Sequence, residues 1–218
     1  MHTYLKRGIS LLLCFAMVFA LSACSAGRAM TEDNITKTVA LVEKALREFD
    51  RDTLQKYVSS KTLDYIIKLA GNKEQFDTIG KLLFEKLEMT VKSVDLENEQ
   101  VTVEIRNRDM ALIGERYANM IRSRCKGDTM AMLNLLGDDD FLDISVRSLT
   151  IQISRATVPD NPVEVTLGVK KGAKNLVLSL GPDAEDAVSG GVVTAVSGIF
   201  SPKSTENGTE EAAADGDN

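Results

Sequence analysis

The side chain best placed for covalent chemistry is the thiol of Cys24, which directly follows an apolar segment near the start of the chain. Residues 8–23, 16 positions, carry no charge, and Lys6 and Arg7 precede them. A membrane-spanning helix needs about 20 apolar residues, so this segment is short for a bilayer span. A short apolar core between a basic start and small residues instead predicts a secretory signal peptide. Cleavage after small residues does not itself require a cysteine, so Cys24 needs a separate explanation.

The residues Leu21-Ser22-Ala23-Cys24 resemble the lipobox of bacterial lipoproteins, in which an aliphatic residue and two small residues precede a lipid-accepting cysteine. The resemblance implies that residues 1–23 are a lipoprotein signal peptide, that the Cys24 sulfur carries a diacylglyceryl group, and that cleavage follows before Cys24. Two acyl chains are needed for a stable anchor, because one chain binds a bilayer only marginally. We therefore expect an extracytoplasmic protein held at the cell membrane by lipid. An ordinary signal peptide with a chance cysteine is the alternative.

Histidine chemistry is excluded from the mature chain, because the single histidine, His2, leaves with the leader. Serine–histidine pairs, cysteine–histidine pairs and histidine-ligated zinc sites are excluded with it. Cys14 also lies in the leader, so Cys125 has no disulfide partner once Cys24 is acylated. We interpret Cys125 as a half-buried helix residue, although the basic residues around it leave a reactive thiol as an alternative. Acid–base chemistry would fall to carboxylates, lysine or tyrosine, and we expect no cofactor.

Two clusters of charged residues could bind ligands. Asp138, Asp139 and Asp140 could hold a divalent cation, because calcium prefers clustered carboxylates. The cluster lacks the spacing and the terminal glutamate of a calcium loop, so we interpret it as the acidic start of a helix and expect no metal site. Arg106 and Arg108 follow a predicted strand and could face an anionic ligand, but their outward phase favours solvent.

Composition limits the choice of partner and divides the chain. Without the leader the chain has 218 − 23 = 195 residues and a net charge of (26 − 2) − 32 = −8. An acidic surface disfavours nucleic acid and a polybasic membrane patch, so the membrane link should come from lipid.

We predict a tether at 24–30, a single α+β domain at 31–200, and a disordered acidic tail at 201–218. The tail has one lysine, five acids and no large apolar residue.

The elements that position these residues follow from apolar periodicity. Apolar residues at spacings of three and four predict a helix over 32–49, which an acidic stretch opens. Ser59 or Ser60 should begin a second helix that ends at Gly71. Asn72, with a glutamine three residues later, should cap a third helix.

Alternating apolar residues predict two hairpins. The first has a strand at 89–96 that changes phase near Lys92-Ser93, which indicates a bulge, and a return strand at 101–106. The second covers 163–180 and turns near 170–173. We therefore expect about four strands in an antiparallel sheet.

The rest of the chain predicts further helices. Residues 110–136 have helical periodicity with a break at Gly127. Residues 142–157 fit a helix or a strand, and the acidic entry favours a helix. A short helix should begin at 183–186, and the uncharged small-residue stretch 187–200 should cover the sheet.

The order of elements resembles the nuclear-transport-factor-2-like cone, also called cystatin-like, and more narrowly the uncharacterised cone-domain lipoproteins of Gram-positive bacteria. The stretches TVALVEKALREFDRDTLQKYVSS, VTVEIRN, VEVTLGVKKGAKNLVLSL and DAVSGG carry the likeness. The resemblance implies N-terminal helices packed on a curved antiparallel sheet. One departure is Lys174-Asn175-Leu176, which stands where relatives usually have an aromatic residue.

A cone fold hosts both enzymes and binders, so shape alone does not give the function. We expect a lipid-anchored, non-catalytic domain of the bacterial cell envelope that binds a small molecule or another envelope protein, and no nucleic acid. The alternative is a small isomerase or dehydratase with a pocket carboxylate, for which Glu104 or Asp109 is the candidate. A structural spacer whose acidic tail repels its neighbours is a third hypothesis.

Overall fold

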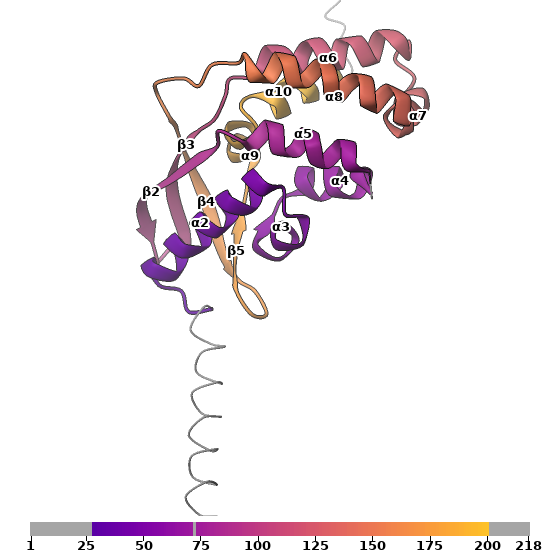
Figure 1. The fold of residues 1–218 in the computed structure, drawn as a ribbon. Coiled ribbons are helices and arrows are strands. Elements are labelled where there is room, and N and C mark those ends of the chain that lie inside the picture. The colour runs from indigo at the N-terminus through magenta and orange to yellow at the C-terminus, as the bar shows by residue number, and fades with distance from the viewer. Residues whose placement is uncertain (1–27, 72, 201–218) are drawn as a thin grey trace, which may run out of the picture.

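The computed structural model describes residues 28–71 and 73–200, which form a five-stranded sheet with helices around it (Figure 1). The predicted α+β class is confirmed, because helices precede, separate and follow two β-hairpins. The predicted leader, Cys24 and the tail at 201–218 lie outside the described residues. Of the predicted tether, residues 28–30 are described, and they contact the folded chain.

The sheet has the strand order β1-β5-β4-β3-β2. One hairpin pairs β2 (Glu88–Asp95) with β3 (Gln100–Arg106), and the other pairs β4 (Val163–Lys171) with β5 (Leu176–Ser179). Both predicted hairpins are confirmed, and the antiparallel pairing of β3 with β4 joins them. A two-residue strand that the sequence does not predict, β1 (Val58–Ser59), pairs in parallel with β5.

The first hairpin contains the predicted bulge and a tight turn. The pairing between β2 and β3 shifts register between Val91 and Ser93, which leaves one residue of β2 unpaired. The Asp95 carboxylate closes the turn, because it accepts hydrogen bonds from the backbone N–H groups of Glu97 and Asn98 at 3.0 and 2.9 Å. Hydrogen bonding from Asn98 also lowers the pKa of Asp95.

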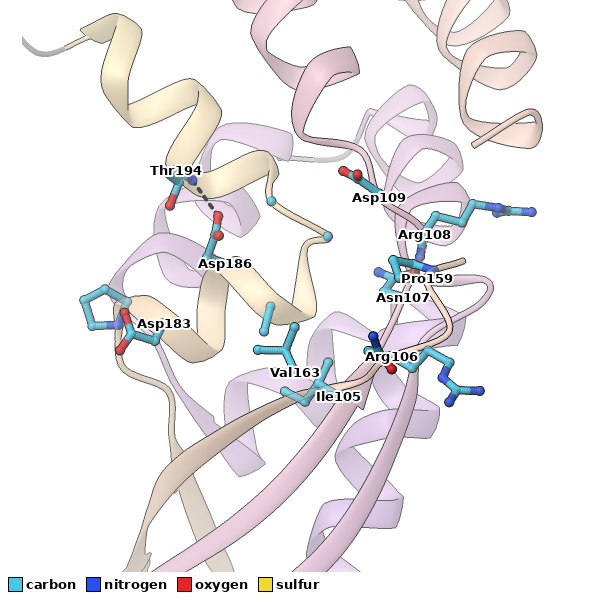
Figure 2. Close-up of a pocket in the computed structure, with 15 residues that line it drawn as sticks. Ile105, Arg106, Asn107, Arg108, Asp109, Pro159, Val163, Asp183, Asp186 and Thr194 are labelled. Atoms are coloured by element: carbon cyan, nitrogen blue, oxygen red, sulfur yellow. Dashed lines mark hydrogen bonds between the residues drawn. The ribbon is translucent and has the colours of Figure 1, made fainter. Parts of the chain in front are cut away.

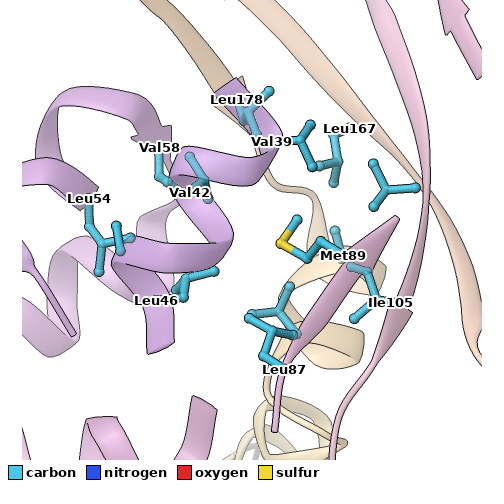
Figure 3. Packing of buried hydrophobic residues seen from close by; sticks show 14 of the residues in the cluster. Val39, Val42, Leu46, Leu54, Val58, Leu87, Met89, Ile105, Leu167 and Leu178 are labelled. Carbon is cyan, nitrogen blue, oxygen red and sulfur yellow. The ribbon is translucent and has the colours of Figure 1, made fainter. Parts of the chain in front are cut away.

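The main core lies between the sheet and α2 (Glu32–Glu48), which crosses one face of it (Figure 3). Five residues form the predicted apolar stripe: Ile35, Val39, Val42 and Leu46 lie on the helix and are at most 2% exposed, whereas Phe49 follows its end and is 6% exposed. The stripe meets buried side chains of the strands: Met89, Val101, Val103, Ile105, Leu167, Val169, Leu176 and Leu178. Each fully buried aliphatic side chain contributes about 1.5–3 kcal/mol, so this layer supplies a large share of the stability.

Phe49 forms the corner after α2, with its backbone in the left-handed region at φ 51°. α3 (Arg51–Tyr57) follows, and the Phe49 ring stacks on Phe84 with 6.3 Å between the ring centroids. The close approach of α5 (Glu74–Phe84) depends on Gly80, because a Cβ there would overlap the Phe49 ring. A glycine inside a helix costs about 1 kcal/mol, and here the packing of the Phe49 ring offsets that cost.

The predicted helix after Ser60 is confirmed as α4 (Lys61–Ala70). The Ser60 hydroxyl accepts a hydrogen bond from the backbone N–H of Leu63 at 3.0 Å, which satisfies one of the free donors at the helix start. Gly71 stands at the end of α4, as predicted, with a positive φ of 52°.

The predicted cap of α5 falls on Asn72, next to the observed start of the helix. Residue 72 lies outside the described residues, and Lys73 occupies the N-cap position without a side-chain cap. The Lys73 ammonium instead donates to the carbonyl of Gly137 at 2.6 Å and to the Asp139 carboxylate at 2.5 Å. The start of α5 is therefore held by a contact with a distant segment, which a local capping pattern cannot reveal.

The predicted helical region 110–136 is confirmed as two helices, α6 (Ala111–Arg124) and α7 (Thr129–Gly137). Gly127 lies between them with a φ of 77°, and Lys126 before it is also left-handed at 51°. Two consecutive left-handed residues turn the chain sharply, and glycine carries the less costly of the two conformations.

The ambiguous segment 142–157 is helical over residues 142–154, as favoured, and this part belongs to α8 (Asp139–Ser154). The Asp138 carboxylate caps this helix by accepting the backbone N–H of Phe141 at 2.7 Å. The next two aspartates of the run lie in the first turn, where negative charge suits the helix dipole. The interpretation of this run as a helix start is confirmed.

The last two helices pack against different parts of the molecule. α9 (Pro182–Val188) packs on β3 and β4, whereas α10 (Val192–Phe200) packs along α6 and not on the sheet. The expected covering of the sheet is therefore wrong for α10. Gly190 and Gly191, at φ 64° and 86°, turn the chain away from the sheet.

Candidate functional site

A cleft of about 420 Å³ opens where β3 ends and β4 begins, against α9 and the start of α10 (Figure 2). Its floor is apolar and includes Ile105, Val163 and Ala187. Val163 is 54% exposed although it begins a strand, so the cleft leaves apolar surface open. The polar rim combines side chains from several segments: Arg106, Asp109, Asn161, Asp183, Asp186 and Thr194.

Asn107 holds the inner wall of the cleft together. Its side chain is buried, and its amide donates to the carbonyls of Leu83 at 2.9 Å and Val188 at 2.8 Å. Its amide oxygen accepts the backbone N–H of Arg108 at 2.8 Å. One side chain therefore joins the end of β3 to α5 and α9. Burying the Asn107 amide without these hydrogen bonds would destabilise the fold.

The glycine pair of the DAVSGG stretch forms the opposite wall. A Cβ on Gly190 would overlap the carbonyl of Arg108, and one on Gly191 would stand 2.8 Å from the Ala111 side chain. The Gly190 carbonyl accepts the backbone N–H of Met110 at 2.8 Å. These contacts require glycine, because any side chain would push the two walls apart.

The rim carries both signs of charge, and several of its groups are already engaged. The Asp186 carboxylate accepts the backbone N–H of Thr194 at 2.7 Å (Figure 2). The Asp109 carboxylate accepts the N–H of Ala111 at 3.3 Å, and Arg106 donates to a backbone carbonyl at 2.9 Å. An apolar floor beneath a mixed rim suits an amphipathic ligand or a peptide segment.

The prediction that Arg106 and Arg108 face solvent is wrong for Arg108. Arg108 is 7% exposed, and its guanidinium lies 3.0 Å from the Glu85 carboxylate. The hydrogen bond from Arg108 is the main cause that lowers the pKa of Glu85. β3 ends at Arg106, so strand alternation no longer fixes the direction of the side chains that follow.

Glu104 and Asp109, the candidate acids of the enzyme hypothesis, are not brought together. Glu104 lies on β3 and pairs across the hairpin with Lys92 at 2.8 Å, which raises the pKa of that lysine. Asp109 lies on the cleft rim. The main core between α2 and the sheet consists of apolar side chains, so neither acid lies in that interior.

A third acid that sequence reasoning missed, Glu185, lies half-buried between α9 and α4. It accepts hydrogen bonds from the hydroxyls of Ser60 and Thr62. Both carboxylate oxygens are occupied, and the arrangement ties the start of α4 to α9 across more than 120 positions of sequence. The partners are too far apart along the chain for a local motif to show them.

Cys125 is buried and occupies the C-cap position directly after α6, so the prediction of a half-buried residue within a helix is wrong in both burial and position. Within 28–71 and 73–200, no three carboxylate, cysteine or histidine side chains gather as metal ligands would. Cys24, the predicted lipidation site, lies outside the described residues.

Comparison with protein-family models, with curated proteins and with solved structures finds no match to this chain. No helix in the described part of the chain is long and apolar enough to cross a bilayer.

Proposed function

We propose that this chain is a lipid-anchored, extracytoplasmic lipoprotein of the bacterial cell envelope and that its cleft binds a ligand or a protein segment without catalysis. The leader and the cysteine at position 24 support the anchor. The anchor then fixes the orientation of the domain, and the orientation decides which surface is available for binding.

The observation that carries the proposal is the contact of Arg28 with the far end of the second hairpin. Its guanidinium donates to the carbonyl of Ala173 at 3.0 Å, in the turn between β4 and β5. The four steps of chain from Cys24 to Arg28 span at most about 14 Å. The β4–β5 turn would therefore lie near the bilayer.

The cleft lies at the opposite end of β4. Val163, the first residue of this nine-residue strand, contributes to the floor of the cleft. Nine residues of strand span about 30 Å, so an anchor at Cys24 would hold the cleft well away from the lipid surface. A small molecule or an envelope protein could reach it there.

The apolar main core disfavours the enzyme alternative. A cone enzyme of the isomerase type needs a carboxylate in a pocket that encloses the substrate. The space between α2 and the sheet is filled by aliphatic and aromatic side chains instead. Binding at the rim needs no such acid.

Metabolic labelling with a radioactive fatty acid such as palmitate tests the anchor. We expect wild-type protein and Cys125→Ala to carry label and to remain with membranes, because Cys125 is buried and stands apart from the leader. Cys24→Ala should lose the label. Equal labelling of Cys24→Ala and wild type, or release of the wild type without acyl mass, would reject the anchor.

Cysteine protection tests the cleft separately. Thr194→Cys places a thiol on the rim, and Thr90→Cys places one on an exposed part of β2 as a matched control. If a partner occupies the cleft, maleimide should label Thr194→Cys about tenfold more slowly in native membranes than after purification, as expected for a ligand well above its dissociation constant. Thr90→Cys should show no such difference. Equal behaviour of the two positions would contradict binding at the cleft.

A further inference from the structure

The arginines of the described residues fall into two groups. Those from position 28 to 108 each donate to a carbonyl or pair with a carboxylate: Arg28, Arg47, Arg51, Arg106 and Arg108. Those from position 116 to 155 make no ion pair or side-chain hydrogen bond with any described residue: Arg116, Arg122, Arg124, Arg147 and Arg155. The second group lies on or next to α6 and α8, although the chain as a whole is acidic.

Two of these arginines, Arg116 and Arg124, line a cleft of about 150 Å³ between α6 and α8, which we call the α6–α8 cleft. They are the charged residues among its lining side chains, which also include Tyr117, Ile144, Ser148 and Gln152. The Arg124 guanidinium lies over the Phe141 ring, 5.6 Å from the centroid. This contact restrains the arginine near the cleft without neutralising its charge.

Most acids of the same helices are engaged elsewhere and do not offset this charge. Asp128 and Asp138 accept backbone N–H groups at the starts of α7 and α8. Asp139 pairs with Lys73, and Asp143 accepts the amide of Gln75 on α5. Glu115 and Asp140 are the remaining acids on α6 and α8, so arginines predominate around the cleft.

We propose that the acidic C-terminal segment of this chain, residues 201–218, docks across the α6–α8 cleft and pairs its carboxylates with Arg116 and Arg124. The segment carries five acids and one lysine, which complements the unpaired arginines. It begins directly after α10, and α10 packs along α6 (Figure 1). The segment therefore starts beside the helix that carries both arginines.

The spacing of charges fits this pairing. Arg116 and Arg124 are eight residues apart on one helix face, which corresponds to about 12 Å. Glu206 and Glu210 are four residues apart, which corresponds to about 13 Å in an extended chain. The six steps from the end of α10 to Glu206 span about 20 Å, enough to cross one helix.

Covalent attachment makes this segment the favoured occupant. A tethered segment has an effective concentration of the order of millimolar, so a millimolar affinity for the cleft is enough to occupy it about half of the time at low salt. A bilayer is a poorer candidate, because a lipid anchor near Arg28 would sit at the other end of the sheet. The docking does not depend on that anchor, and the test below works with or without lipid on the chain.

A photocrosslinking amino acid at Gly208, between the two glutamates, tests the docking in the full-length chain held in detergent micelles. We expect intramolecular adducts that map to α6 and α8 by mass spectrometry. Arg116→Gln with Arg124→Gln should reduce these adducts at least about fivefold, and so should about 0.5 M NaCl, which shortens the screening length to about 4 Å. Arg47→Gln, which removes a charge from α2, should leave them unchanged.

A charge exchange separates lost pairing from lost folding. Arg124→Glu alone should abolish the adducts, and Arg124→Glu combined with Glu210→Arg should restore them. Adducts that survive removal of both arginines, that map to the sheet, or that fall on dilution because they join two molecules would overturn the proposal. No adduct above background in the wild-type sequence would overturn it equally.

Discussion

The sheet half of the molecule, which we define as the five strands with α2 and α9, differs sharply from the helical layer of α6, α7 and α8. In the sheet half, Ile35, Leu167 and Leu178 are 0% exposed. In the helical layer, Leu112, Ile144 and Ile151 are 55%, 61% and 54% exposed. Burial, and with it stability, is therefore concentrated in the sheet half, where the cleft residue Val163 at 54% is the main exposed apolar side chain of the strands, while the helical layer leaves several apolar side chains open.

Charge follows the same division. Arg108, beside the sheet half, is buried against Glu85, and Arg51 pairs with Asp77. The arginines on α6 and α8 lack such partners among the described residues. One region therefore uses its charges to hold the fold, and the other leaves them available for binding.

Truncation of an aliphatic side chain should separate the two regions most strongly. Leu167→Ala removes a fully buried side chain from β4 and should lower the free energy of unfolding by about 3 kcal/mol, because it leaves a cavity. Ile151→Ala on α8 should change it by less than about 0.5 kcal/mol, because that side chain is mostly in water. Urea denaturation followed by circular dichroism measures both. Similar losses for the two variants would break the comparison.

The corner at Phe49 should give the next largest effect. Gly80→Ala puts a methyl group into the Phe49 ring and should lower the free energy of unfolding by about 2 kcal/mol. Gly137→Ala, at the end of α7, meets open space and should leave that free energy unchanged or raise it by up to about 1 kcal/mol. If Gly80→Ala is as stable as wild type, the Phe49 ring can move to make room for the methyl group. The tightly packed region would then not include the corner at Phe49.

The parts of the fold that the sequence predicted are those set by neighbouring residues. The stripe of α2 repeats within its own helix, and the reversal of phase at Lys92-Ser93 marks the bulge within its own strand. The caps at Ser60 and Asp138 act three residues away. Periodicity and capping report such features because the partners are close in sequence.

The parts that could not be predicted depend on residues distant in sequence. Asn107 joins carbonyls 24 and 81 positions away, and Glu185 is bonded to hydroxyls on α4. Arg108 was expected in solvent because the partner that buries it, Glu85, is on another element. The cleft brings together three separate stretches of chain, and the sequence marked two of them, through the candidates Arg106, Arg108 and Asp109 and through the DAVSGG stretch, without showing that they meet. Which stretches meet is decided by tertiary packing.

The Arg108–Glu85 pair gives a smaller effect that depends on pH. Glu85→Gln leaves the buried Arg108 guanidinium without its anion and should lower the free energy of unfolding at neutral pH. Because Glu85 itself is half exposed, solvent screens the pair, and we expect a loss of only about 1 kcal/mol. Glu97→Gln, in the exposed β2–β3 turn, is the matched control and should have almost no effect. Denaturant midpoints at pH 7 measure both variants.

The same pair should add a pH dependence with a definite sign. The folded state holds the pKa of Glu85 below its usual value of 4.5. The stabilisation is therefore complete above about pH 5 and is lost as the pH falls through the lowered folded pKa. Asp50 and Asp95 also have lowered pKa values, so the wild type loses further stability in the same range. The loss between pH 5 and pH 3 should be smaller in Glu85→Gln than in wild type, and equal losses would contradict a stabilising pair.

The smallest expected effect is the removal of a charge from the helical layer. Arg147→Gln on α8 should change the free energy of unfolding by no more than about 0.5 kcal/mol, because Arg147 makes no ion pair with any described residue. Arg51 is its counterpart beside the sheet half. Arg51→Gln removes the contacts of the guanidinium with the Asp77 carboxylate, with a backbone carbonyl and with the face of the Phe49 ring. This variant should lower the free energy of unfolding by about 1–2 kcal/mol. If Arg147→Gln costs as much as Arg51→Gln in the same urea titration, the arginines of the helical layer also hold the fold. Their charge would then be needed within the molecule and would no longer be free to bind an acidic segment.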